Sequence, residues 1–196
     1  PTNLGEVSAK IKDQTSKLFG AGIIFPEGSL AKQDTSFTLN LESGQTNITT
    51  QVLNDLDTKD ISSITIETTH PSLLTYPSSE VKIASAFTVA VPISSFGLNL
   101  AQNPERLTIF YKIYDFKEKK IKSGIKVNPE VSLSDDGNHL LASFSNFGVF
   151  QATLTNEKIE KSLETESKSK FIYRQDLTAV EIFKTQDSSS AKEANI

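Results

Sequence analysis

In its last third the chain reads Leu140-Leu141-Ala142-Ser143-Phe144-Ser145-Asn146-Phe147-Gly148-Val149-Phe150-Gln151-Ala152-Thr153-Leu154. Side chains alternate in character up to Asn146, and an apolar alternation resumes after Gly148, from Val149 to Leu154. An alternation with a period of two residues is typical of half-buried strands. The segment therefore predicts two strands that meet at a sharp corner and close a β-sandwich.

The same pattern recurs upstream of this corner. Strands are predicted at residues 18–25, 36–41, 61–67, 81–83, 86–93, 106–115 and 119–127. A loop is predicted from Thr68 to Ser79, because Pro71 and Pro77 hold it extended. Strands spaced by about eight to twelve residues, with no amphipathic helix before residue 155, favour an all-β class and an antiparallel, immunoglobulin-like β-sandwich.

A chain of 196 residues is long enough for one large all-β domain or two small sandwiches in tandem. The predicted division is a first sandwich half or subdomain at residues 1–84 and a second at 85–154. Residues 155–196 are rich in Ser, Glu and Lys and are predicted to form a polar tail. In that tail, 157–166 could form a short helix, whereas 171–174 and 179–184 could dock as added strands.

Composition excludes several classes of partner and site. The net charge of -4 argues against nucleic acid or an anionic membrane surface, because both select basic patches. The basic cluster Lys117–Lys122 is interpreted as a solvated hairpin tip or edge strand. The chain has no Cys, so disulfides, thiolate catalysis and Cys-ligated zinc are excluded. No run of about 18 apolar residues occurs, so no membrane span is expected in this portion.

A Cys-free β chain rich in Ser, Thr and Asn is typical of a bacterial surface or periplasmic protein. The first residue is Pro1, and a lipoprotein trimmed just past its anchoring cysteine would have this composition. We therefore expect an extracytoplasmic location, at the cell surface, anchored to the outer membrane or in the periplasm.

The segment Ile23-Ile24-Phe25-Pro26-Glu27-Gly28-Ser29-Leu30 resembles the I-x-I/F-P-x-G-A/S-L signature of a known sandwich domain. That domain occurs in zona-occludens proteins, ankyrins, netrin receptors and many bacterial surface proteins. Val89–Ile93 followed by Leu107–Tyr111 resembles the second sandwich of its tandem form. The resemblance covers residues 18 to 154 and implies a β-sandwich, in tandem form.

The same lineage includes self-cleaving relatives, among them the GAIN domain of adhesion receptors. Their cleavage site reads His-Leu/Phe-Ser/Thr, and residues 143–150 resemble it, with Phe144–Ser145 as the scissile bond and Ser145 as the nucleophile. Such cleavage needs a strained peptide, an attacking hydroxyl and a base. Ser143 stands where the pattern has His, and a serine does not accept a proton near neutral pH.

A base for this cleavage would have to come from elsewhere, and the chain has two histidines, His70 and His139. His139 precedes Ser145 by six residues on the same predicted strand, which separates them by about 20 Å at the rise of a strand. His70 lies in a predicted loop. The sequence therefore favours a serine and phenylalanine corner that closes the sheet, with self-cleavage as an alternative.

Two further candidate sites are read from side-chain type and spacing. Asp55, Asp57 and Asp60 are spaced as in a weak calcium loop, but the Gly and the late Glu of an EF-hand loop are missing, which favours a plain acidic surface loop. The aromatic residues Tyr111 and Tyr114 lie within the β-prone segment 106–115, and Phe116 comes directly after it. If they were exposed, they would form a strip for a sugar or a protein.

These observations predict a non-catalytic binding or structural module of a surface or periplasmic protein. Its expected partner is another surface protein or a glycan, and no cofactor, resident metal or nucleic acid is expected. Two alternatives remain: a self-cleaving sandwich domain that cuts at Phe144–Ser145, and a carbohydrate-binding module.

Overall fold

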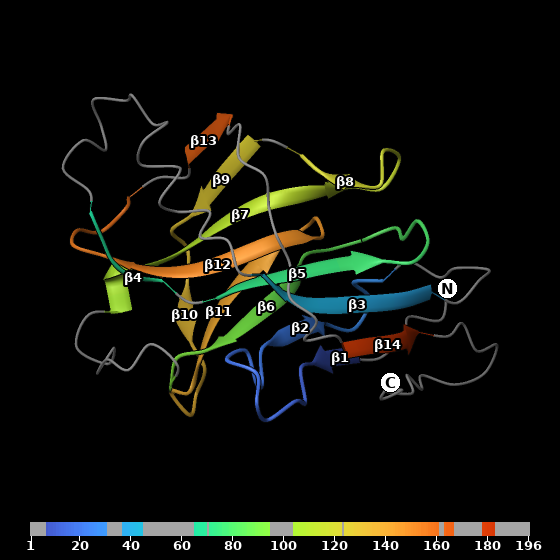
Figure 1. The fold of residues 1–196 in the computed structure, drawn as a ribbon, viewed down its shortest axis with the longest axis horizontal. Helices are drawn as coiled ribbons and strands as arrows, with labels where there is room; N and C mark the ends of the chain where they lie inside the picture. Colours follow the sequence, from blue (N-terminus) through green and yellow to red (C-terminus); the bar gives the residue numbers. More distant parts are fainter. Residues whose placement is uncertain are drawn as a thin grey trace.

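The structure is a computed structural model that describes residues 7–30, 37–44, 65–69, 71–94, 104–122, 124–160, 163–166 and 178–182. Within these ranges the regular structure is antiparallel strands with short 3-10 turns, among them η3 (Pro104–Arg106) (Figure 1). The strands are β1 (Val7–Lys10), β2 (Gly22–Phe25), β3 (Phe37–Gly44), β4 (Ile66–Thr69), β5 (Ser72–Pro77), β6 (Phe87–Pro92), β7 (Leu107–Asp115), β8 (Lys120–Ile121), β9 (Gly124–Asn128), β10 (Ser132–Leu133), β11 (His139–Phe144), β12 (Gly148–Thr155), β13 (Leu163–Glu166) and β14 (Thr178–Ile182). The all-β prediction is confirmed.

The described strands form two sheets. The smaller sheet has five strands in the order β1-β2-β6-β11-β10. The larger sheet has nine strands: seven follow the order β13-β9-β7-β12-β5-β3-β14, while β4 pairs with β12 and β8 with β7. Both sheets draw strands from before and after residue 84. The proposed division at that residue, like the narrower expectation of an immunoglobulin-like strand order, stays a prediction.

Apolar side chains from the two sheets meet in one core. Alternate residues of each strand face inward, as the period-two pattern predicts. The smaller sheet contributes Ile23, Phe25, Phe87, Val89 and Leu140, and the larger sheet contributes Leu39, Leu41, Ile109, Phe150 and Ala152. All ten are 1% exposed or less, so the two layers pack face to face as a sandwich.

The chain crosses between the sheets at residues 145–147. Strand β11 belongs to the smaller sheet and β12 to the larger one, so the predicted corner is confirmed. Phe147 enters the core there, with its ring 5.2 Å from that of Phe87 and 6.1 Å from that of Phe25. Across the corner, the ring of Phe144 on β11 lies 4.6 Å from the ring of Phe150 on β12. Aromatic rings from both sheets therefore fill the turn.

The strand predicted at residues 81–83 is absent, since only Ile83 forms an isolated bridge, to Leu30. Two further local predictions were wrong, and strand pairing explains both. Residues 72–77 form β5, between β12 and β3, inside the segment predicted as a loop. The prolines bracket this strand: Pro71 precedes it and Pro77 ends it. Residues 163–166 form β13, which pairs with β9, where a short helix was predicted. In both cases pairing with a distant strand outweighed local preference.

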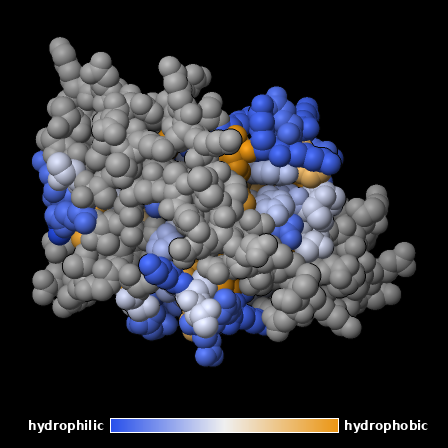
Figure 2. Space-filling model, viewed as in Figure 1, coloured by the Kyte–Doolittle hydropathy of each residue, from blue (hydrophilic) through white to orange (hydrophobic). Residues whose placement is uncertain are grey.

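The basic cluster lies where the sequence placed it. Lys117 and Lys119 are exposed in the turn that joins β7 to β8. Figure 2 shows hydrophilic residues gathered over this hairpin, at the upper right of the view. Lys120 pairs with Glu118 at 2.6 Å, so part of the basic charge is neutralised within the turn. No helix in the ranges that the structure describes is long and apolar enough to cross a lipid bilayer.

Candidate functional site

The side of the smaller sheet that faces away from the core, called here the outer face, is assembled from two rows of side chains. Cross-strand register places Lys10, Gly22, Ala90, Leu141 and Ser132 in one row across all five strands. The neighbouring row on the same face holds Ser8, Ile24, Thr88 and Ser143. Most of these side chains are small, so the face is low along its middle.

Two hollows lie on the outer face and adjoin at Leu141, which lines both of them. The long hollow, of about 490 Å³, is lined by Lys10, Gly22, Ile24, Ala90 and the turn between β10 and β11. The small hollow, of about 380 Å³, is lined by Leu141 and by Thr88, Asn128, Glu130, Val131, Ser132, Ala142 and Ser143. Together they form a surface that we call the outer-face groove.

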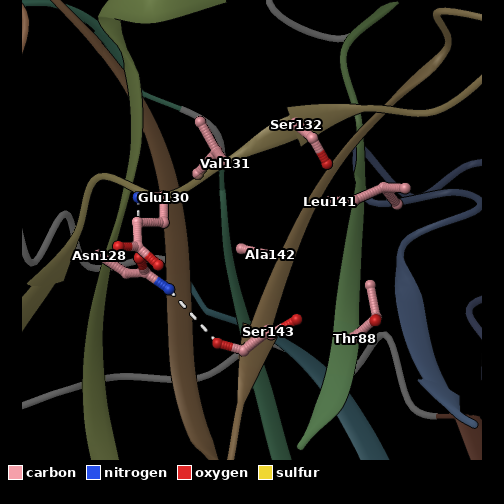
Figure 3. A pocket seen from close by; sticks show the side chains of 8 residues that line it. All are labelled: Thr88, Asn128, Glu130, Val131, Ser132, Leu141, Ala142 and Ser143. Atoms are coloured by element: carbon pink, nitrogen blue, oxygen red, sulfur yellow. Dashed lines mark hydrogen bonds between the residues drawn. The ribbon is translucent and has the colours of Figure 1, made fainter.

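The small hollow has a mixed polar and aliphatic lining, and Figure 3 shows its side chains, which come from β6, β9, β10, β11 and the segment between β9 and β10. The Asn128 amide nitrogen donates a hydrogen bond to the backbone carbonyl of Ser143 at 3.3 Å. The Glu130 backbone N–H donates to the side-chain oxygen of Asn128 at 2.9 Å. These bonds tie the segment after β9 to β11, so the wall of the small hollow is fixed relative to its floor.

The turn between β10 and β11 forms an acidic wall of the long hollow. The Ser134 hydroxyl donates to an oxygen of the Asp136 carboxylate at 2.5 Å, and the Asn138 backbone N–H donates to the same oxygen at 3.0 Å. The Ser134 hydroxyl also accepts from the His139 backbone N–H at 2.9 Å. Asp135 lies between Ser134 and Asp136 in the sequence. It is exposed and lines the long hollow. The turn is thus held in one shape with a negative rim.

The hydrogen bonds of this turn lower the pKa of the Asp136 carboxyl group. The Ser134 hydroxyl, followed by the Asn138 amide, lowers the pKa of Asp136 from the ordinary 3.8 to about 2. Hydrogen bonds that favour the ionised form act in this direction. Asp136 is therefore charged at any pH at which the protein would work.

This lowered pKa predicts an acid dependence of stability. Because the folded pKa lies below the ordinary value, the contribution of Asp136 is present above pH 3.8 and is lost as the pH falls through about 2. We expect Asp136→Asn to lower the melting temperature at neutral pH, and the difference from the wild type to shrink as the pH falls over this range. Thermal melts of both proteins at a series of pH values measure this difference in melting temperature. A difference that stays constant down to the lowest pH would contradict the lowered pKa of Asp136.

Sequence reasoning placed a possible self-cleavage site at the corner. Phe144 is buried at the end of β11, and Ser145 is exposed in the bend that follows. His139 lies at the opposite end of β11, opposite Pro92, and its Nε2 lies beside Gly20. The structure therefore does not bring His139 to Ser145. His70, the other candidate base, lies outside the described residues.

The described corner residues 144–148 have no positive φ. Among the described residues, the non-glycine residue with positive φ is Lys119, at 50°, and no peptide bond is cis. Lys119 belongs to the β7–β8 turn and not to the corner at residues 145–147. No described residue at the Phe144–Ser145 bond has a positive φ; self-cleavage there stays a prediction.

The three candidate aromatic residues do not form one exposed strip. Tyr111 packs against the core, with its ring 4.9 Å from that of Phe144 and 6.2 Å from that of Phe150. The ring of the half-buried Tyr114 lies 5.7 Å from that of Tyr76. Phe116 is half-buried in the β7–β8 turn. The aspartates Asp55, Asp57 and Asp60 lie outside the described residues.

Sequence reasoning missed the outer-face groove. Its floor is made of alternate residues of five strands, most of which are the polar or small half of a period-two pattern in the sequence, and its walls include the turn residues 134–136. The signal available was the high share of Gly, Ala, Ser and Thr at these outward positions, which predicts a low surface once the strands are aligned. The alignment itself is a property of the fold.

No family model, no curated protein and no solved structure was found to match this chain.

Proposed function

We propose that this chain is a non-catalytic binding module of an extracytoplasmic protein, with the outer-face groove as its ligand surface. The observation that carries the proposal is the groove itself. A sheet face turned to solvent ordinarily carries polar side chains that stand above the backbone. Here Ile24, Ala90 and Leu141 form an aliphatic floor at the bottom of a hollow with a charged rim. Concave apolar surfaces edged by a few polar groups are typical of ligand sites.

The hydrogen bonds of the rim support binding rather than catalysis. Ser134, Asp136 and His139 are the residue types of a hydrolytic triad, but the Ser134 hydroxyl donates directly to Asp136 and accepts from the backbone of His139. A triad instead needs a serine that donates to the imidazole. A carboxylate with a pKa of about 2 is also a weak proton acceptor at neutral pH. These contacts shape the turn.

The extracytoplasmic part of the proposal is supported by composition. The chain has no Cys and is rich in Ser, Thr and Asn, as expected for a surface or periplasmic β protein, including an anchored lipoprotein or an adhesin. Expression of the full-length gene in its own host, followed by protease treatment of intact cells and of spheroplasts, measures the location. Protection of the chain in both preparations would contradict it.

The binding proposal is tested by screening the protein against a random displayed peptide library and a glycan array. Leu141→Glu places a charge in the middle of the aliphatic floor, so we expect it to weaken binding of a selected ligand by about tenfold or more. Ile121→Glu, at a half-buried aliphatic position on β8 in the larger sheet, is the matched control and should keep the affinity.

Two results would contradict this proposal. One is the absence of a ligand in both screens. The other is a ligand that binds the wild type and Leu141→Glu equally well. Thermal melts of both variants show whether a loss of binding comes from unfolding, since a folded Leu141→Glu protein that has lost its ligand locates the site in the groove.

A further inference from the structure

The outer-face groove carries charges of opposite sign on opposite sides. Lys10 is exposed on β1, the edge strand at one side of the smaller sheet. Asp135 and Asp136 are exposed on the turn that follows β10, the edge strand at the other side. All three residues line the long hollow. Glu130 adds a further carboxylate in the small hollow.

Between these charges the floor is aliphatic and low. Gly22, Ala90 and Leu141 lie in the same row as Lys10, one on each successive strand. A row across five strands spans four inter-strand spacings, about 19 Å at 4.8 Å each. An extended peptide rises about 3.3 Å per residue, so about six residues cover the row. The row from Lys10 to Ser132 is thus as long as a short peptide segment that crosses the strands.

Charge and shape favour a peptide over a neutral glycan. A neutral glycan would leave Lys10 and the two aspartates without counter-charges at both sides of the groove. Sugar rings also bind well against flat aromatic faces, and the described residues that line the long hollow include no Phe, Tyr or Trp. A peptide offers aliphatic side chains for the floor and charged ones of either sign for the two sides.

Resting on the proposed function, we infer that the outer-face groove binds an extended peptide segment of a partner protein. The segment crosses the strands with an aliphatic side chain over Ala90 and Leu141 and a Lys or Arg against Asp135 and Asp136. An acidic group of the segment lies towards Lys10.

The test starts from a random twelve-residue peptide library displayed on phage and selected on the wild-type protein. We expect the enriched peptides to share a basic residue a few positions away from an aliphatic one. Asp135 is the residue to change, because Asp136 also holds the turn through Ser134 and Asn138. Asp135→Lys should weaken a selected peptide about tenfold through like-charge repulsion.

A charge exchange makes the test specific. Replacing the basic residue of the selected peptide by Glu should weaken its binding to the wild type and restore its binding to Asp135→Lys. The matched control is Glu118→Lys, at an exposed acidic position in the β7–β8 turn, which should bind both peptides as the wild type does. Fluorescence anisotropy with labelled synthetic peptides measures each affinity.

The outcomes separate this inference from the proposed function. A glycan ligand that Leu141→Glu abolishes, with no peptide enriched, would overturn the peptide assignment and leave the groove as the binding site. Enriched peptides that Asp135→Lys binds like the wild type would overturn the placement of the basic residue. Ligands of either kind that Leu141→Glu retains would overturn both the peptide assignment and the groove.

Discussion

Replacing Gly148 by alanine is expected to destabilise the protein by about 3 kcal/mol or more, the upper end of what overpacking costs. Gly148 begins β12 and lies between Ile113 of β7 and Thr75 of β5. A Cβ at this position would overlap the carbonyl oxygen of Lys112 and lie 2.9 Å from its carbonyl carbon. Both obstacles are backbone atoms of a paired central strand, so they cannot rotate away as a side chain could.

The melting temperature reports this effect. For a chain of this size, a loss of about 3 kcal/mol lowers it by about 6 to 12 °C. Gly137→Ala is the matched control: Gly137 has a φ of 69°, but nothing lies within 4 Å of the added Cβ. Only the strain of a left-handed alanine remains there, about 1 kcal/mol. Equal melting temperatures for the two variants would show that β7 and β12 adjust freely, against the packing described here.

Gly22→Ala offers a comparison within the other sheet. The added Cβ would overlap the carbonyl oxygen of Ala9 in β1. Because β1 is an edge strand of the smaller sheet, it can shift outward more easily than β7, which is flanked by β9 and β12. We therefore expect a smaller loss of stability than for Gly148→Ala.

Truncating Phe87 to alanine is expected to cost about 4 kcal/mol, within the range for a buried phenylalanine. Phe87 is completely buried and lies in β6 opposite Phe144. Its ring stacks on Phe147 at an angle of 18° and lies 5.5 Å from the ring of Phe25. Removing it leaves a cavity next to the corner between β11 and β12, where residues of both sheets meet.

Urea unfolding measures this loss as a change in midpoint at constant slope. Phe19→Ala is the control, because Phe19 is 48% exposed and its truncation should cost only about 0.5 kcal/mol. Phe87→Leu, which keeps part of the volume, should fall between the two. A Phe87→Ala protein as stable as Phe19→Ala would mean that the corner does not depend on its aromatic cluster.

Strand assignment from sequence succeeded where a strand carries its own pattern. Leu107–Asp115 is rich in β-branched and aromatic residues and forms the predicted strand, which lies between β9 and β12. Ser72–Pro77 failed because two prolines and a serine indicate a loop, while its place in the sheet comes from pairing with Gly148–Phe150 and residues 39–44. Those partners are distant in sequence, so no local window contains the information.

The candidate site also depends on strand pairings that no local window of the sequence contains. Lys10, Gly22, Ala90, Leu141 and Ser132 become one row only after four strand pairings are made. The motifs in the sequence instead predicted candidate sites at the corner Phe144–Ser145 and at the aromatic run that includes Tyr111. Tyr111 proved to be packed against the core, because on β7 it falls on the face that meets Phe144 and Phe150.

The amino-acid sequence alone determined the all-β class, most strand positions and the corner at residues 145–147, because alternation and turn residues act within a few residues of the chain. Only the tertiary structure decided which strands are neighbours, which faces are covered and where charges of opposite sign flank a low aliphatic floor. The physical reason is that a sheet is held by hydrogen bonds and side-chain contacts between segments far apart in the chain, and a groove is a property of the surface that they form together.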